Sequence, residues 1–434
     1  MSHLLDEIVR AQKREKASGI ASICSAHPWV LKAAMSRAGT GTTTQGDEPI
    51  LIESTCNQVN QFGGYTGMTP AAFVAFVLGL AAENGFPSGR LILGGDHLGP
   101  NVWQNEPAAS AMQKSADMVR AYVQAGYTKI HLDTSMRLGG DDPARPLDVE
   151  LAARRAAWLA KAAEETHAKV SEPSHGLRYV IGTEVPIPGG ATAHEDGVRV
   201  TTVEDARRTL EVTRTAFLRE GLGSAWERLV ALVVQPGVEF GDDFVLDYNP
   251  EAARELARFS ETTSLIYEAH STDYQTRDHL RTLVRDHFAI LKVGPALTFA
   301  FREAVFALAM MEAELFPLGQ RSGLLAVLDQ AMLRKPDYWQ EHYHGTPAEK
   351  AFARKYSLSD RLRYYWPDPA VQTALAKLFS NLEGVTIPLS LLSQVAPLVF
   401  NQIRMGKLPH RPASVIDASI QVVLDDYRYA CNPD

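Results

Sequence analysis

Short apolar runs rich in β-branched residues recur along the chain before residue 300, and longer stretches with charged faces separate them. The eight runs are Gly19–Ser25, Ile50–Ser54, Leu91–Gly95, Lys129–Asp133, Tyr179–Glu184, Leu229–Val234, Ser264–Ala269 and Phe288–Val293. Apolar residues recur at helical spacing between them, most clearly in Thr69–Asn84, Pro107–Ala125, Pro146–Glu165, Thr202–Glu220 and Asn249–Glu261. Strands that alternate with helices predict a parallel sheet, and eight such repeats match a (β/α)8 barrel in number and length.

A doubly wound open sheet is the competing architecture. Such a sheet usually has fewer strands and a G-x-G-x-x-G turn after its first strand, and no such turn follows Gly19–Ser25. Beyond about residue 316 the strand-like runs end, and helical segments follow: Gly323–Arg334, Pro347–Ser357, Asp368–Ser380, Leu389–Gly406 and Pro412–Tyr429. We therefore predict an α/β TIM barrel over residues 1–315, with the active site, and a C-terminal helical subdomain over residues 316–434. This subdomain would cover one mouth or side of the barrel, or form a subunit interface.

The composition limits which kinds of binding partner and which cellular compartment we expect for this protein. The net charge is −8, and Lys and Arg form no basic stripe, which argues against a nucleic-acid partner. Cys24, Cys56 and Cys431 show no metal-type spacing and cannot all pair, as expected in a reducing compartment. No apolar signal core begins the chain, and no run approaches the length of a membrane span. We expect a cytoplasmic protein without a membrane partner.

Polar or ionisable residues stand where each apolar run ends. The carboxyl ends of the strands are the place where TIM barrels hold their active sites. The residues there are Ser25 and His27, Glu53–Gly67, Asp96 and His97, His131 and Asp133, Glu184, Gln235–Glu239, Glu268–Asp273, and Lys292–Gly294. This coincidence points to an active site more strongly than any one of the motifs.

Several of these side chains are of the types that bind a divalent ion. The candidate ligands are His97, His270, Glu184 and either Gln235 or Glu239. Zinc is the first candidate, with manganese, cobalt or nickel as alternatives. Such an ion would polarise the carbonyl group of a hydroxy-ketone. His131 lies inside its run, so a core histidine fits the pattern at least as well as a ligand does.

A proton carrier is expected beside the ion. Successive residues of an extended chain point to opposite sides, so Asp96 and His97 do not easily share one ion. Asp96 is therefore the first candidate for acid–base catalysis, with Glu184 and Glu239 as alternatives.

Other strand-end residues suit a substrate that carries a phosphate. The candidates are Asn57, Gly64 and Tyr65 on the Gly-rich loop, Ser271, Lys292, and Gly294 at the start of the following helix. The Gly-rich loop by itself fits a tight turn equally well. Lys292 fits an ion pair lining the barrel, a phosphate or carbonyl contact, or a Schiff base. We rank the Schiff base lowest, because the histidine and glutamate set would then have no purpose.

Long motifs across the whole chain carry a family resemblance. They are Cys24–His27, Asn57–Pro70, Gly94–Asn101, Ile181–Pro186, Val234–Phe240, Tyr267–Thr276, Ile290–Phe299 and Tyr356–Arg361. This set resembles the Z subunit family of D-tagatose-1,6-bisphosphate aldolase, which implies a TIM barrel related to the class II, metal-dependent aldolases. The resemblance implies that His97 and His270 bind zinc, that Asp96 donates the proton, and that the segment at Lys292 lies near the phosphate. Gln235 stands where those aldolases have a ligand histidine, which argues against ordinary bisphosphate aldolase activity.

The resemblance implies two functions in tagatose and galactitol catabolism. One is C4 epimerisation of D-tagatose 6-phosphate to D-fructose 6-phosphate by retro-aldol and aldol steps. The other is a non-catalytic role that supports the catalytic subunit of a class II aldolase. A tagatose 6-phosphate kinase, a label also given to members, is disfavoured because the chain has no G-x-x-x-x-G-K-[ST] motif. A purely supportive subunit needs no ionisable group at every strand end, so we expect the epimerase, as a homo-oligomer with a sugar phosphate substrate. The partner under the alternative function is a class II aldolase catalytic subunit.

Overall fold

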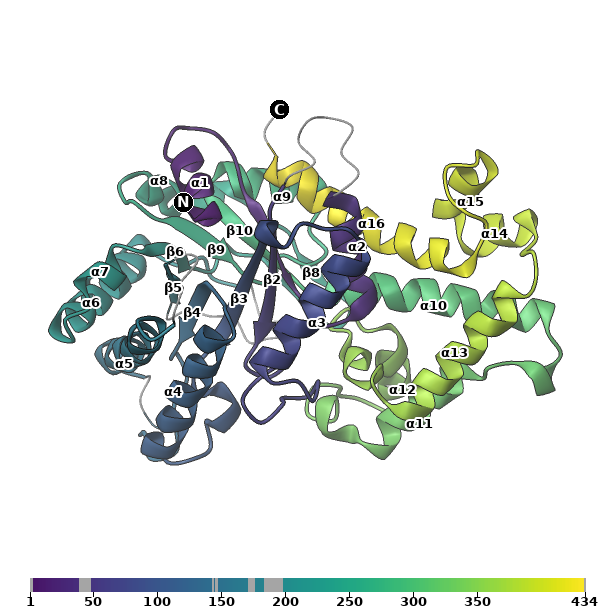
Figure 1. Ribbon diagram of the computed structural model, residues 1–434, viewed down its shortest axis with the longest axis horizontal. Helices are drawn as coiled ribbons and strands as arrows, with labels where there is room; N and C mark the ends of the chain where they lie inside the picture. The colour runs from purple at the N-terminus through teal and green to yellow at the C-terminus, as the bar shows by residue number, and fades with distance from the viewer. Residues whose placement is uncertain are drawn as a thin grey trace.

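Each of the eight apolar runs forms one strand of a closed parallel barrel, so the predicted TIM barrel is confirmed (Figure 1). The computed structural model describes residues 3–38, 48–142, 144, 147–170, 176–182 and 198–432. The strands follow one another around the barrel in the order β1-β10-β9-β6-β5-β4-β3-β2. They are β1 (Ile20–Cys24), β2 (Ile50–Thr55), β3 (Leu91–Leu98), β4 (Lys129–Asp133), β5 (Arg178–Gly182), β6 (Leu229–Val233), β9 (Ile266–Ala269) and β10 (Phe288–Val293).

Helices surround the barrel and begin where the sequence supplies caps (Figure 1). The side chain of Thr69 accepts a hydrogen bond from an amide of the first turn of α3, and Asp148 and Thr202 do the same for α5 and α6. The surrounding helices are α2 (Pro28–Ala38), α3 (Pro70–Glu83), α4 (Ala108–Gln124), α5 (Val149–His167), α6 (Val203–Arg219), α7 (Gly223–Trp226), α8 (Pro250–Glu261) and α9 (Arg277–Arg285). A short antiparallel pair, β7 (Glu239–Phe240) and β8 (Val245–Leu246), follows β6. Its strands are too short to give a periodic pattern in the sequence.

The amino-terminal end of the barrel is closed by α1 (Leu4–Gln12). Leu5 and Ile8 of this helix pack into one buried cluster with Ile20, Leu51 and Ile290 from the barrel strands. A second apolar cluster fills the layer between the outer faces of the strands and the surrounding helices. The interior is therefore apolar at the end that α1 closes, and polar groups collect at the opposite, carboxyl end.

The chain beyond the barrel forms a helical region. It comprises α10 (Pro295–Leu315), which leads out of the barrel, and α11 (Leu324–Arg334), α12 (Pro347–Tyr356), α13 (Pro369–Glu383), α14 (Leu389–Val395), α15 (Pro397–Arg404) and α16 (Pro412–Cys431). Helix α16 runs back along α10 to the barrel and packs against α2 and α9 (Figure 1). The hydroxyl of Tyr427 on α16 donates a hydrogen bond to the carbonyl oxygen of Thr272, with the oxygens 2.8 Å apart. The helical region is thus fastened to the barrel near the carboxyl ends of the strands.

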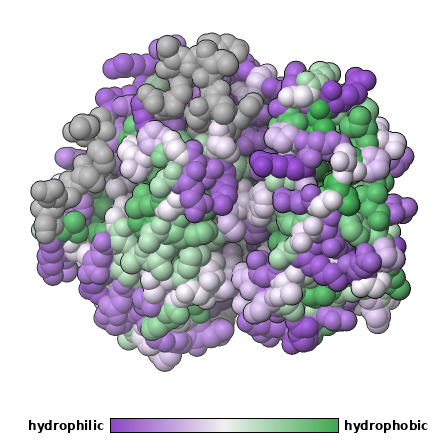
Figure 2. All heavy atoms as spheres, turned by 45° about the vertical axis from the view of Figure 1, so that its right-hand side comes forward, coloured by the Kyte–Doolittle hydropathy of each residue, from purple (hydrophilic) through white to green (hydrophobic). Residues whose placement is uncertain are grey.

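Apolar side chains are exposed on the side of the molecule that carries the helical region. Figure 2 shows green patches there among the purple, hydrophilic ones. The large apolar side chains exposed in this region include Met310, Leu318, Leu333, Phe352, Leu398 and Met405. None of the helices in the described part of the chain is long and apolar enough to cross a membrane.

The end of β3 lies so close to β4 that only glycine fits between them. A Cβ atom on Gly99 would overlap the carbonyl oxygen of Asp133. We expect Gly99→Ala to lower the free energy of unfolding by about 1–3 kcal/mol, because the two strand ends must separate. Gly79→Ala is the matched control, since a Cβ at this exposed position of α3 meets nothing, and it should stabilise by about 0.5–1 kcal/mol. Urea unfolding measures both, and equal effects at the two sites would contradict this account.

Candidate active site

A cavity of about 380 Å³ lies over the carboxyl ends of the strands. The barrel contributes the side chains of His97, His270 and Lys292 to its wall. The helical region contributes Arg363, Tyr364, Trp366, Gln372 and Leu375. A cavity of this size suits a small metabolite. Because both parts of the chain line it, the helical region forms part of the site and does not only flank the barrel.

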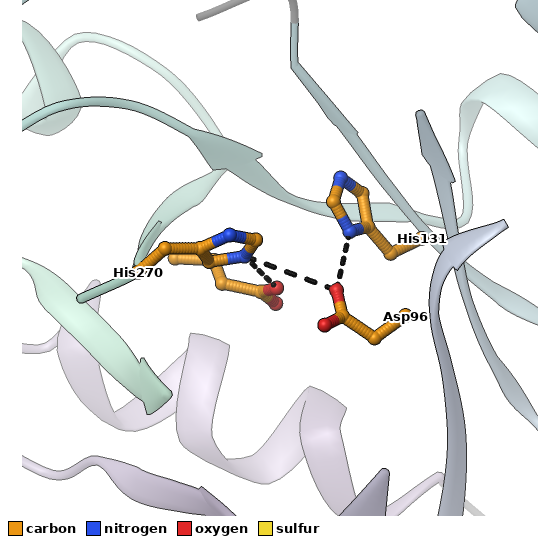
Figure 3. A group of neighbouring side chains, drawn as sticks. Asp96, His131 and His270 are labelled. Carbon is orange, nitrogen blue, oxygen red and sulfur yellow. Dashed lines mark hydrogen bonds and ion pairs between the residues drawn. The ribbon is translucent and has the colours of Figure 1, made fainter. Parts of the chain in front are cut away.

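Two histidines and two carboxylates gather beneath this cavity (Figure 3). One ligand atom from each of Asp96, His131, Glu268 and His270 lies within 4.8 Å of the others. Nδ1 of His131 is 2.7 Å from a carboxylate oxygen of Asp96, and Nε2 of His270 is 3.0 Å from one of Glu268. All four residues are at most 2% exposed. Of the four, only His270 lines the cavity.

His97 belongs to a separate pair of interactions at the cavity wall. Its Nδ1 is 2.8 Å from a carboxylate oxygen of Asp133, and its Nε2 is 2.7 Å from Nζ of Lys292. Lys292 also forms an ion pair with Asp96. The backbone of His97 has a φ of +49°, a strained conformation for a residue with a side chain. With this turn, Nε2 of His97 still lies 3.6 Å from a carboxylate oxygen of Asp96, its neighbour in sequence.

Burial and ion pairing together fix the charges of these groups. Burial lowers the pKa of His270 to about 3 and lowers the pKa of His97 as well, so both rings are neutral near pH 7. Burial alone would raise the pKa of Asp96, but His97, Lys292 and a hydrogen bond from His131 hold that pKa well below its usual range. Burial disfavours the charged form of Lys292, but the charge of Asp96, the hydrogen bond to it and the charges of other nearby groups together outweigh burial and raise the pKa of Lys292. The site therefore combines neutral imidazoles with an ionised carboxylate and an ammonium group.

A second lysine, Lys129, forms ion pairs with two buried carboxylates, those of Glu53 and Glu268. Nζ of Lys129 is 2.5 Å from an oxygen of Glu53 and 2.7 Å from an oxygen of Glu268, and all three side chains are fully buried. The hydroxyl of Ser22 donates to the other oxygen of Glu53, at 2.6 Å. A chain of contacts thus runs from β1 through β2 and β4 to β9, where Glu268 orients His270.

The residues beneath the cavity fit a divalent cation. Imidazole nitrogens and carboxylate oxygens are the ligand types that zinc and similar ions take. Nδ1 of His131 and Nε2 of His270 are the ring nitrogens that face carboxylate oxygens in Figure 3, so these are the two that one ion would share with the carboxylates. The carboxylates of Asp96 and Glu268 lie 2.7 and 3.0 Å from these imidazole nitrogens. Two imidazole nitrogens and two carboxylates in one buried group are a donor set that such an ion takes.

The structure brings together some of the residues expected from the sequence and separates others. Asn57, Tyr65, Ser271 and Gly294 line the cavity with His97, His270 and Lys292, whereas Asp96 lies beneath it. Gly64 does not line the cavity; it takes a left-handed turn, with a φ of +56°, against the backbone of Gln58. Glu184 lies outside the described residues.

The two candidates that follow β6, Gln235 and Glu239, accept hydrogen bonds from backbone amides of their own loop. An oxygen of the Gln235 side chain accepts hydrogen bonds from the amides of Gly237 and Val238, at 2.8 and 3.1 Å. An oxygen of Glu239 accepts one from the amide of Phe240, at 3.0 Å. Neither residue belongs to the group of four beneath the cavity.

The amides expected to receive a phosphate are also occupied. The carboxylate of Asp273 accepts hydrogen bonds from the amides of Gly294 and Ala296, at 3.0 and 2.8 Å. The start of α10 is therefore already paired with an anion of the chain itself.

Two residues of the buried group, His131 and Glu268, were noted among the strand-end residues of the sequence but were not selected as ligands. Both lie inside strands rather than at their ends. Their signal is alternation: Lys129, His131 and Asp133 share one face of β4, and Glu268 and His270 share one face of their segment. Polar residues at every second position of a buried strand point into the barrel, which is where these side chains lie.

The chain is similar in sequence to one known protein family and to several named proteins. The sequence pattern of one family, described as D-tagatose-1,6-bisphosphate aldolase subunit GatZ/KbaZ-like, matches residues 5–432. Proteins named D-tagatose-1,6-bisphosphate aldolase subunit GatZ, from Salmonella paratyphi B and Salmonella typhimurium, are 53% identical over 430 residues, which are 99% of this chain and 100% of each relative. The crystal structure of a probable tagatose 6 phosphate kinase from Sinorhizobium meliloti 1021 is 44% identical, with a TM-score of 0.86 over 95% of this chain and 100% of that one.

Proposed function

The chain belongs to the GatZ/KbaZ-like family of D-tagatose-1,6-bisphosphate aldolase subunits, and from this premise we propose that it is itself an enzyme. The proposed reaction is metal-dependent C4 epimerisation, which interconverts D-tagatose 6-phosphate and D-fructose 6-phosphate. The observation that carries the proposal is the buried group of Asp96, His131, Glu268 and His270 beneath a cavity of metabolite size. Burying so many ionisable groups is costly, and a subunit that only supports a partner gains nothing from it.

The residues that would hold the ion are Asp96, His131, Glu268 and His270. A divalent ion bound there would polarise the ketone oxygen of the substrate. Zinc suits this set of two nitrogens and two carboxylates, and manganese, cobalt or nickel take the same ligand types.

His97 is placed to hold the proton of the C4 hydroxyl. Its Nδ1–H donates to Asp133, and its Nε2, the basic nitrogen of a ring that lines the cavity, accepts a hydrogen bond from Lys292. The C4 hydroxyl would take the place of this hydrogen bond when the substrate binds. As Nε2 takes the hydroxyl proton, the C3–C4 bond breaks into an aldehyde and a three-carbon enediolate. The aldehyde presents its other face, the C3–C4 bond re-forms, and Nε2 returns the proton to the oxygen on C4.

Lys292 supports this step with its charge. Its ammonium group lies 2.7 Å from Nε2 of His97 and lines the same cavity. A positive charge at that place stabilises the negative charge that develops on the enediolate oxygens. The roles of Asp96 and His97 are thereby exchanged relative to those that the family resemblance implies. What supports the exchange is that His97 lines the cavity, whereas Asp96 lies beneath it with His131.

A second candidate function is support of a class II aldolase catalytic subunit. The names of the Salmonella relatives, taken alone, favour this hypothesis over the epimerase. The exposed apolar side chains on the helical region, such as Leu318 and Phe352, would suit a partner surface. The kinase title of the Sinorhizobium protein is not carried over, because this chain has no G-x-x-x-x-G-K-[ST] motif.

One experiment separates the two functions. The purified chain, loaded with zinc or manganese, is incubated alone with D-tagatose 6-phosphate, and fructose 6-phosphate is assayed. A class II aldolase catalytic subunit is then added, and its activity and melting temperature are measured with the wild-type chain and with His270→Gln. We expect fructose 6-phosphate from the wild-type chain alone and none from His270→Gln. Stimulation of the partner by both proteins, without any turnover by the chain alone, would instead establish the supporting role.

A further inference from the structure

Arg363 places a positive charge in the cavity wall without a direct ion pair to a carboxylate. The residue belongs to the short helical segment Arg361–Tyr365 of the helical region, and its side chain lines the cavity. Its Nη1 donates to the carbonyl oxygens of Ser359 and Asp360, the latter at 2.9 Å. The nearby carboxylate of Asp360 is engaged elsewhere, because it pairs with Arg302 at 3.1 Å and accepts a hydrogen bond from Thr298. Within the described ranges, no acidic side chain pairs with the guanidinium of Arg363.

One edge of this guanidinium remains available. Nη2 donates one hydrogen bond, to the hydroxyl of Tyr364 at 2.8 Å, and no described residue accepts from Nε. The guanidinium carbon lies 4.4 Å from the centre of the Tyr364 ring, and that ring meets the edge of Tyr65 at 4.7 Å between centres. These contacts fix the plane of the guanidinium and leave Nε–H and the second Nη2–H side by side. Two parallel donors of this kind match two oxygens of a phosphate.

The other charged groups of the cavity are already balanced. The ammonium group of Lys292 pairs with Asp96. The amides at the start of α10 are taken by Asp273. Arg363 is thus the cavity-lining cation, among the described residues, that makes no direct ion pair with a carboxylate, although Asp273 and Asp360 lie near enough to interact with its charge.

We propose that Arg363 binds the phosphate group of the substrate, so that the helical region recognises the end of the sugar phosphate that does not react. This inference rests on the proposed function, and it gives the phosphate a site different from the Gly-rich loop and the start of α10. The single cavity that holds His97 and His270 at the barrel also reaches Arg363. A ketohexose 6-phosphate would then lie with its carbonyl end toward the barrel and its phosphate toward the helical region.

Titration calorimetry of inorganic phosphate binding to the full chain tests the proposal without any need for turnover. Arg363→Met should weaken phosphate binding at least about tenfold, because a charge-assisted pair of hydrogen bonds is lost. Arg363→Lys should restore part of it. Arg404→Met is the matched control, since it removes the same charge from an exposed site outside the cavity, and it should bind phosphate like the wild type. Wild-type phosphate affinity in a folded Arg363→Met protein would overturn the proposal.

If Arg363→Met does not fold, Arg363→Gln, which keeps a polar side chain of similar length, decides in the same way. Kinetics separate this inference from the proposed function. If phosphate binding depends on Arg363 while the chain has no epimerase activity, the proposed function fails and the phosphate site stands. If the chain is an epimerase and the Arg363 variants keep the wild-type KM and phosphate affinity, the phosphate site fails and the proposed function stands.

Discussion

Replacing His97 by glutamine is expected to lower the rate of epimerisation by about 10²–10⁴-fold, the usual contribution of a positioned acid–base group. The variant should keep its bound metal, because the proposed ligands are Asp96, His131, Glu268 and His270. Asp133→Asn should also lower the rate, since the hydrogen bond that orients the His97 ring at 2.8 Å is altered.

Metal analysis of the same variants separates this assignment from the alternative. His270→Gln should lose the metal, and His97→Gln should retain it. His344→Gln is the matched control, because this histidine is exposed and does not line the cavity, and both its activity and its metal content should be unchanged. Loss of the metal from His97→Gln would contradict the account and would support the ligand role that the family resemblance implies.

Replacing Lys129 by methionine is expected to destabilise the protein by about 3–5 kcal/mol, because it leaves two buried carboxylates without their partner. The side chains of Glu53 and Glu268 lie 2.5 and 2.7 Å from the lysine nitrogen and are fully buried. Urea unfolding measures the change. Lys161→Met removes an exposed ion pair to Glu220 of 2.9 Å, and it should have little effect on stability because solvent screens exposed charges.

A triple variant shows whether charge or packing causes this loss. Glu53→Gln and Glu268→Gln, added to Lys129→Met, remove the unpaired charges and should recover part of the stability. A Lys129→Met protein as stable as Lys161→Met would contradict the structural role given to this group, as would a triple variant less stable than Lys129→Met alone.

The strands of the barrel could be predicted because each is a short apolar run between polar segments. The polar side chains inside the barrel were harder to predict, because they lie within the same apolar runs that form the strands. His131 and Glu268 stand within their strands, where a single polar residue is commonly a satisfied core group. Only the repeated alternation at Lys129, His131 and Asp133 marks an inward-facing polar row.

Other parts of the site depend on contacts between distant segments. Arg363 lies far beyond the barrel in sequence, and its place in the cavity results from the packing of the helical region over the strand ends. No local pattern marks it. Gln235 was selected because it follows a strand, but local amide groups compete for its side-chain oxygen, as is common where a polar residue begins a turn.

The most direct test of the central claim is to convert D-tagatose 6-phosphate with the metal-loaded chain alone in D₂O and to follow the products by proton NMR. Cleavage and re-formation of the C3–C4 bond never remove the hydrogen on C4. The account therefore predicts fructose 6-phosphate that keeps its C4 hydrogen and that forms far more slowly with His97→Gln. Absence of fructose 6-phosphate, or deuterium at C4 of the product, would contradict it.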